Sequence, residues 1–167
     1  MATLVFCHGK ESGPSGTKIN HLRPLGEQYG FDVVAPDFRG LDDPEARVER
    51  LLALAGDWRA PLVLAGSSMG GYVAIRGSQT LEPEGLLLMA PAVGLPGYAE
   101  RAPKPVAGQI RVVHGWRDEI IPAQIVVDWC FDHRFDLRLV DDAHALGNSL
   151  DTLAEALKDI LTRIREP

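Results

Sequence analysis

The sequence lacks the features that mark several broad classes of protein. Only 2 of its 167 residues are cysteine, only 7% are aromatic, and the 17 Lys and Arg are outnumbered by 23 Asp and Glu. No hydrophobic run approaches the roughly 20 residues that a membrane-spanning helix needs. The net charge of -6 leaves no basic surface for nucleic acid or anionic lipid. We therefore expect neither a nucleic-acid partner nor a membrane partner.

The two cysteines, Cys7 and Cys130, fall on an apolar strand-like run and an apolar helix-like run. Neither belongs to a C-x-x-C pair or to a metal-ligand spacing, so we predict no disulfide and no metal site. The opening residues MATLVFCHGK have no basic region and no small-residue cleavage site typical of an export signal. We expect a cytoplasmic protein, in a compartment that keeps thiols reduced.

Strand-like apolar runs alternate with amphipathic helix-like runs along the whole chain. The runs expected to form strands are 3–7, 32–35, 62–65, 85–90, 110–114 and 135–140. The segments expected to form helices are 15–29, 44–55, 69–80, 122–131 and 150–164. Asp43 is placed to cap the helix that starts at Pro44, and Ser149 or Asn148 to cap the last one.

Nearly uniform apolar runs such as GLLLMA at 85–90 are typical of strands buried on both faces. Together with the alternating rhythm, they predict an α/β fold with a doubly wound, mostly parallel sheet of about six strands and helices on both faces. A hydrophobic content of 46% over 167 residues suits a single domain, 1–167. The Gly- and Pro-rich stretch 93–109 is too short to form a cap domain.

The most informative motif is G-S-S-M-G at 66–70, which follows an apolar strand and opens a helix. In this G-x-S-x-G pattern the central serine, Ser68, sits on a sharp strand-to-helix turn with its hydroxyl exposed at the edge of the sheet. Ser67 occupies the first variable position and is not expected at the apex. Short motifs of small residues also arise by chance, so the case for Ser68 depends on its surroundings.

A base and an acid follow later strands in the order that this template requires. His144 lies in DDAHAL, between the last strand and the last helix, and an imidazole can take and return the serine proton. Asp118 lies in GWRDEIIP after the fifth strand and can orient His144. Because the carboxyl ends of parallel strands share one edge, we predict a triad of Ser68, His144 and Asp118.

Other polar residues near these positions receive structural interpretations. Glu119 is expected to point elsewhere, and Asp141 and Asp142 to shape the loop around His144. His114 is interpreted as a structural residue or a pocket wall. The two histidines on helix-like segments, His21 and His133, are expected to be solvated, and the expected pocket walls are Tyr72, Leu95, Trp116 and Leu146.

Two backbone N–H groups are expected to bind the oxyanion of the reaction. Met69 follows the serine at a helix N-terminus, and Lys10 lies in the glycine-rich loop after the first strand. We interpret the Lys10 side chain as solvated. The segment GPSGTK at 13–18 does not match the P-loop order, in which Lys directly follows Gly, so we predict no nucleotide cofactor.

These runs give the chain a resemblance to the α/β-hydrolase superfamily. The segments at 8–18, 66–72, 115–122 and 141–146 resemble most those of small cap-less bacterial serine esterases of the YqiA type. The resemblance implies hydrolysis of esters with short acyl chains through an acyl-enzyme on Ser68. It carries over Asp118 and His144 as acid and base, and Met69 and Lys10 as oxyanion donors. The antiparallel N-terminal strands of the usual hydrolase core are expected to be absent here.

We thus predict a serine esterase that acts on small-molecule esters with short to medium acyl chains. A thioesterase, a lactonase or a peptidase would use the same three residues, so the sequence leaves these alternatives open. A non-catalytic ligand-binding protein on this fold is the alternative from another class.

Overall fold

The computed structural model describes residues 1–166. These residues form one six-stranded sheet in the order β2-β1-β3-β4-β5-β6, and every neighbouring pair is parallel. In chain order the elements are β1 (Ala2–Cys7), α1 (Thr17–Gln28), β2 (Phe31–Val34), α2 (Pro44–Leu54), the 3-10 helix η1 (Ala55–Asp57), β3 (Leu62–Ser67), α3 (Met69–Leu81), β4 (Gly85–Met89), β5 (Gln109–Gly115), α4 (Ala123–His133), β6 (Asp136–Val140) and α5 (Leu150–Arg165). The predicted doubly wound sheet is confirmed, and the described part of it is wholly parallel.

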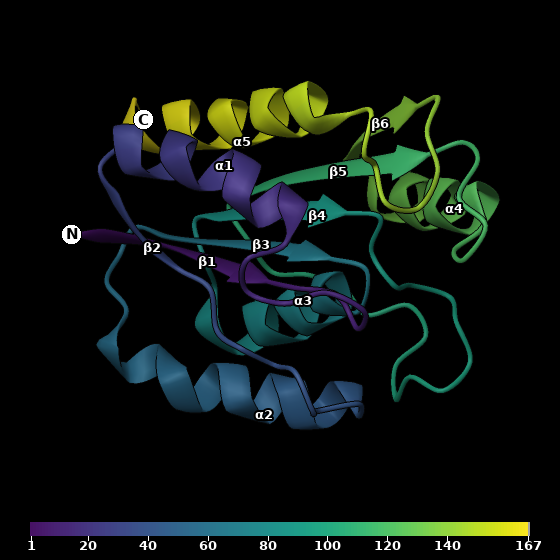
Figure 1. Ribbon diagram of the computed structural model, residues 1–167, viewed down its shortest axis with the longest axis horizontal. Helices are drawn as coiled ribbons and strands as arrows, with labels where there is room; N and C mark the ends of the chain where they lie inside the picture. The colour runs from purple at the N-terminus through teal and green to yellow at the C-terminus, as the bar shows by residue number, and fades with distance from the viewer. Residues whose placement is uncertain (167) are drawn as a thin grey trace.

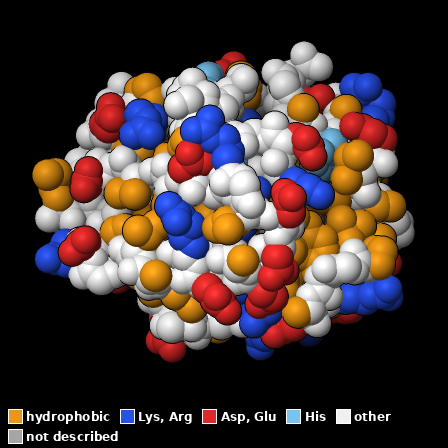
Figure 2. Space-filling view, turned by 60° about the horizontal axis from the view of Figure 1, so that its bottom comes forward, with side chains coloured by type: hydrophobic (Ala, Val, Ile, Leu, Met, Phe, Trp, Pro, Cys, Tyr) orange, Lys and Arg blue, Asp and Glu red, His pale blue; other side chains and the backbone are white. Residues whose placement is uncertain are grey.

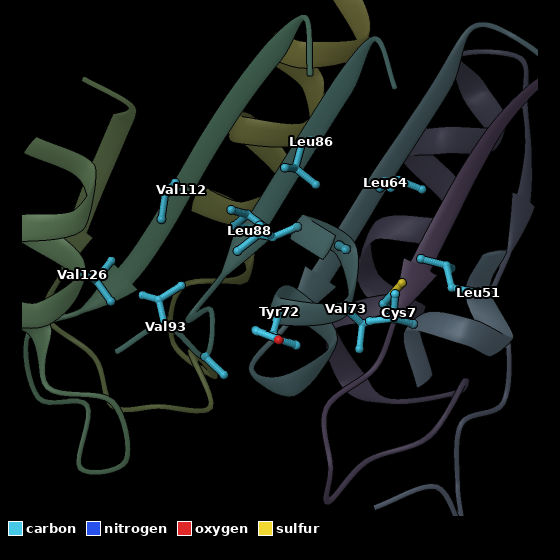
Figure 3. Close-up of a cluster of buried hydrophobic side chains, with 14 of the residues drawn as sticks. Cys7, Leu51, Leu64, Tyr72, Val73, Leu86, Leu88, Val93, Val112 and Val126 are labelled. Carbon is cyan, nitrogen blue, oxygen red and sulfur yellow. The ribbon is translucent and has the colours of Figure 1, made fainter. Parts of the chain in front are cut away.

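Helices cover both faces of the sheet, as the apolar strands require. Helices α1 and α5 lie side by side on one face, and α2, α3 and α4 lie on the other (Figure 1). Successive residues of a strand point to opposite faces, so Leu64, Leu86 and Leu88 join the cluster beneath α2 and α3 (Figure 3). Their neighbours Val63 and Leu87 pack against α1 and α5. Each central strand therefore contributes to two cores.

The ends of two helices test the predicted caps. The Asp43 carboxylate accepts a hydrogen bond from the Glu45 N–H at 3.3 Å and caps α2, with Pro44 in the first turn as expected. Ser149 precedes α5, but its hydroxyl caps nothing, because it donates to Asp142 at 2.8 Å instead. Ser149, one of the two predicted residues, is thus the N-cap residue of α5, but its hydroxyl stabilises the preceding loop rather than the first turn of the helix.

The connection from β4 to β5 contains no helix or strand, so the absence of a cap domain in the described chain is confirmed.

Within residues 1–166, no helix has both the length and the hydrophobicity needed to cross a membrane. Figure 2 shows Lys and Arg side chains scattered among Asp and Glu on the face it presents, rather than gathered into a basic surface.

The topology places one pair of loops where a ligand site forms most readily. The chain runs outward from β1 to β2 and then returns to the other side of β1 as β3. At such a switch point the loops that leave the two central strands diverge and open a crevice at their carboxyl ends. The loops concerned are 8–16, after β1, and the turn at Ser68, after β3.

We predict that Gly66→Ala destabilises the fold, because the elbow has no space for a side chain at this position. A Cβ on Gly66 would overlap the backbone of Gly70 and Gly71, which cannot move aside as a flexible side chain could. We expect a loss of about 3 kcal/mol in the free energy of unfolding, measured by urea denaturation. Gly56→Ala is the matched control, since a Cβ at Gly56 meets nothing within 4 Å. Equal denaturation midpoints for the two variants would contradict the prediction.

Candidate active site

Ser68 occupies a strained turn between β3 and α3. Its backbone angles are φ 54° and ψ -120°, in a region of backbone space that residues with a side chain rarely adopt. The turn is tight enough that α3 begins at the next residue, Met69. Gly70 lies so close to the end of β1 that a Cβ there would overlap the Cys7 carbonyl. The elbow therefore holds Ser68 beside the loop that follows β1.

The three residues predicted to form a triad lie together at this edge of the sheet. His144 Nε2 is 3.0 Å from Ser68 Oγ, and His144 Nδ1 is 2.7 Å from Asp118 Oδ2. The Asp118 side chain is fully buried and that of His144 is 20% exposed. A carboxylate at Nδ1 favours the tautomer with its proton on that nitrogen, which leaves Nε2 free to accept the serine proton.

Hydrogen bonds keep the buried Asp118 ionised. Its Oδ1 accepts from the N–H groups of Ile120 and Ile121, both at 2.8 Å. Burial raises the pKa of Asp118, but the hydrogen bonds from His144 and from these two amides outweigh burial. The pKa of Asp118 consequently lies below that of an ordinary aspartate.

A second histidine contacts the same carboxylate. His114 is fully buried, and its Nε2 lies 2.9 Å from the Ile121 carbonyl and 3.3 Å from Asp118 Oδ2. Since a carbonyl only accepts, Nε2 carries the proton. Nδ1 is then an acceptor, and it has no hydrogen-bond partner among residues 1–166. Burial lowers the pKa of His114, which favours the neutral ring. His114 is thus a structural residue, as expected, and its structural contact is with the predicted acid.

The loop that carries His144 is fixed by its own carboxylate. Asp142 accepts from the Ala143 N–H at 2.8 Å and from the Asn148 N–H at 2.9 Å. This agrees with the prediction that Asp142 shapes the loop. Glu119 departs from its prediction, because its Oε2 accepts from the His144 N–H at 3.4 Å and its side chain lines the site. The turn that ends at Asp118 therefore brings both Asp118 and Glu119 into contact with His144.

A second fixed point of this loop comes from α1. Lys18 Nζ donates to the Ala145 carbonyl at 2.8 Å and so connects the first turn of α1 with the loop after β6. Burial lowers the pKa of Lys18. The two residues are far apart in the sequence, and no local pattern predicts their contact.

The two residues predicted to supply oxyanion donors line the same cleft as Ser68. Met69 and Lys10 line one cleft of about 500 Å³, and within residues 1–166 neither backbone N–H has a hydrogen-bond partner. The residues around this cleft are Gly9, Lys10, Glu11, Ser12, Lys18, Ser67, Ser68, Met69, Leu95, Tyr98, Glu119, Ile120, His144 and Ala145. An adjoining cavity of about 220 Å³ shares four of them: Ser12, Lys18, Ser67 and Ala145.

Of the four expected pocket walls, only Leu95 lines the cleft. Leu146 belongs to the core, and Trp116 is 58% exposed outside the cleft. Tyr72, on α3, is buried in the core (Figure 3), and its hydroxyl donates to Glu45 on α2. Tyr98 and Ile120 line the cleft instead. Ile120 lies two residues after Asp118 in the motif GWRDEIIP, which could have indicated it, whereas no motif surrounds Tyr98.

Comparisons with known proteins agree with this architecture. Residues 4–164 match a protein-family model described as "Alpha/beta hydrolase family". The chain is 33% identical to a protein from Xanthomonas campestris pv. campestris whose crystal structure assigns it to the alpha/beta hydrolase superfamily. That match covers 97% of this chain and 98% of the other, with a TM-score of 0.88. No curated protein matches the chain.

Two further solved structures share the fold. One is a serine hydrolase without a lid from Xanthomonas campestris, 26% identical over 97% of this chain and 81% of the other, with a TM-score of 0.75. The other is Est1E from Butyrivibrio proteoclasticus with ferulic acid bound, 15% identical over 100% and 90% of the two chains, with a TM-score of 0.78. At that identity the likeness to Est1E concerns the fold alone.

Proposed function

The chain belongs to the alpha/beta hydrolase family, and from this premise we propose that it is a serine esterase. The observation that carries the proposal is the continuous line from Ser68 Oγ through His144 to Asp118, with heavy-atom distances of 3.0 and 2.7 Å. A serine hydroxyl becomes an effective nucleophile only when a base takes its proton. Ser68 has such a base within hydrogen-bond reach, and that base has an ionised orienting group.

The reaction proceeds through an acyl-enzyme. Ser68 Oγ attacks the ester carbonyl carbon while His144 Nε2 takes the hydroxyl proton. When the tetrahedral intermediate collapses, the carbon–oxygen bond to the alcohol breaks and His144 returns the proton to the leaving oxygen. A water molecule then attacks the acyl-enzyme by the same steps, which release the acid and restore Ser68. Asp118 stays ionised throughout and stabilises the protonated ring.

The carbonyl oxygen becomes an anion in each tetrahedral intermediate, and we assign its stabilisation to two backbone donors. These are the N–H groups of Met69 and Lys10, two residues that line the cleft of Ser68, and neither N–H has a hydrogen-bond partner within residues 1–166. The Met69 donor also benefits from the N-terminus of α3. Fixed donors need no reorganisation as charge develops, which is why such groups are effective in catalysis.

The size of the site favours small acyl groups. The cleft of about 500 Å³ is open, since the connection from β4 to β5 forms no lid over it. Leu95, Tyr98 and Ile120 offer apolar surface for a short or medium chain. A long lipid chain would extend beyond them into water, where it gains no burial. The sequence segments 8–18, 66–72, 115–122 and 141–146 also support our proposal that the chain is an esterase of the YqiA type.

We predict that Ser68→Ala abolishes the hydrolysis of p-nitrophenyl butyrate. Loss of the nucleophile should lower kcat by at least about 1000-fold, because only the oxyanion donors and substrate binding remain. Labelling by a fluorophosphonate probe should disappear as well. Ser67→Ala is the matched control, since it removes the neighbouring hydroxyl and should still be labelled. Activity of Ser68→Ala within tenfold of the wild type would reject Ser68 as the nucleophile.

We predict that Asp118→Asn lowers kcat by about 1000-fold to 10,000-fold. An amide can donate to His144 Nδ1, which would place the ring proton on Nε2 and prevent that nitrogen from accepting the serine proton. Asp141→Asn is the control, because the Asp141 side chain is 86% exposed and pairs with Arg117 on the surface. Both variants are assayed on p-nitrophenyl butyrate after their thermal midpoints are compared. Equal kcat values for the two would contradict the assignment.

We predict that activity depends on acyl length, with a maximum among short and medium chains. On p-nitrophenyl acetate, butyrate, octanoate and palmitate, kcat/KM should peak within the first three and fall by about tenfold or more on palmitate, since the surplus methylenes stay outside the cleft. The assay uses monomeric substrate below the micelle concentration. A steady rise through palmitate would contradict the proposed substrate class.

A further inference from the structure

A buried arginine lies behind the loop that follows β1. Arg47, on α2, is 1% exposed, and within residues 1–166 it forms no ion pair with a carboxylate. Its guanidinium is met by backbone carbonyls alone: Nε donates to Leu41 O at 2.7 Å, and Nη1 to His8 O at 3.1 Å and Gly9 O at 3.2 Å. The Phe38 ring lies 5.8 Å from its central carbon. Burial lowers the pKa of Arg47, but the pKa of an arginine lies so far above neutrality that the side chain keeps its charge.

The Gly9 carbonyl receives a second donor from His8. The ring of His8 is buried, and its Nε2 accepts the Phe38 N–H at 2.9 Å, which shows that Nε2 carries no proton. The proton is therefore on Nδ1, which donates to Gly9 O at 2.7 Å. Burial also lowers the pKa of His8 and keeps the ring neutral. One carbonyl oxygen thus holds a charged donor and a neutral donor, both from buried side chains.

The other end of that peptide unit is the proposed oxyanion donor. Gly9 C=O and Lys10 N–H belong to one planar trans peptide, in which the two groups point in opposite directions. Because Arg47 and His8 hold the carbonyl toward the interior, the Lys10 N–H points away from them. Lys10 lines the cleft beside Ser68, and its N–H has no partner among residues 1–166.

We propose that Arg47 is a positioning residue of the oxyanion hole, which acts through the Gly9–Lys10 peptide. The inference deepens the proposed esterase function and rests on it. Arg47 fixes the plane of the peptide, so that its N–H stays aimed at the developing oxyanion. A cation bonded to the carbonyl also polarises the peptide and makes the N–H a stronger donor, as in any chain of hydrogen bonds.

The physical situation of Arg47 supports a role beyond packing. Burying a cation with no carboxylate in direct contact is unfavourable, although Asp42 is near enough to favour the charged form. An apolar side chain of similar length would fill the same space without this cost. An arginine also suits this task better than a lysine, because its planar fork reaches several carbonyls at once.

Three variants test the proposal on p-nitrophenyl butyrate. Arg47→Met keeps the length and removes the charge, Arg47→Lys keeps the charge without the fork, and Arg39→Met is the control. Arg39 is an exposed cation of the neighbouring loop, paired with Asp37. We expect Arg47→Met to lower kcat by about 10-fold to 100-fold with KM within about threefold, since the contact acts on the transition state. Arg47→Lys should fall between Arg47→Met and the wild type, and Arg39→Met should match the wild type.

Two readouts separate positioning from general damage. Binding of phenylboronic acid, which forms a tetrahedral adduct on serine, should weaken in Arg47→Met by the same factor as kcat/KM. The low-field NMR resonance of the proton between His144 and Asp118 should persist. The proposal is overturned if folded Arg47→Met keeps kcat within threefold of the wild type, or if that resonance is lost together with activity.

The wild-type protein provides a test of the Lys10 donor that needs no variant, and Arg47→Lys tests the role of Arg47 if Arg47→Met does not fold. On binding phenylboronic acid, the amide proton of Lys10 should move downfield together with that of Met69. Movement of Met69 alone would overturn the inference while leaving the esterase intact. A wild-type protein that hydrolyses no ester and binds no boronate would reject the proposed function, and the inference with it.

Discussion

The site depends on one close approach of backbone to backbone. Gly70, at the start of α3, lies against the carbonyl of Cys7 at the end of β1, and Gly66 lies against Gly70 itself. A side chain at Gly70 would push the elbow away from β1, and one at Gly66 would push the start of α3 away from β3. Since β1 and β3 are neighbours at the switch point of the sheet, this contact brings Ser68 and the loop 8–16 to one crevice. The donors assigned to the oxyanion come from these two separate segments, so their spacing is set by the contact.

Each of the two buried charges near the crevice lies behind a group where the proposed reaction develops charge of the opposite sign. Asp118 places a negative charge behind His144, the group that becomes positive when it takes the serine proton. Arg47 places a positive charge behind the Lys10 peptide, which faces the oxygen that becomes negative. A buried neutral histidine accompanies each charge. His8 bonds to the same Gly9 carbonyl as Arg47, and His114 contacts the Asp118 carboxylate. Fixed charges of this kind need not reorganise as the reaction proceeds.

The sequence predicted the parts of the site that depend on chain order. Ser68, Asp118 and His144 each follow an apolar strand, and parallel strands end at one edge, so chain order alone is enough to expect that the three residues meet. Contacts across the fold could not be expected in this way: the bond from Lys18 to Ala145 joins residues 127 positions apart. Arg47 did leave a local signal, since Pro44, Arg47, Val48 and Leu51 form the buried stripe of α2 at helical spacing. A lone charge on such a stripe indicates a specific buried partner.

The strain at Ser68 can persist because the elements on both sides of it are tightly packed. A residue held at φ 54° gains energy by relaxing, and only rigid surroundings prevent this. Val63, Leu64 and Ala65 of β3 are completely buried between β1 and β4, and Tyr72, Val73 and Ala74 of α3 are completely buried against the sheet. Relaxing the turn would require one of these packed segments to slide, which would open gaps in both cores. The dense centre of the sheet therefore stabilises a half-buried serine in a conformation that its own backbone disfavours.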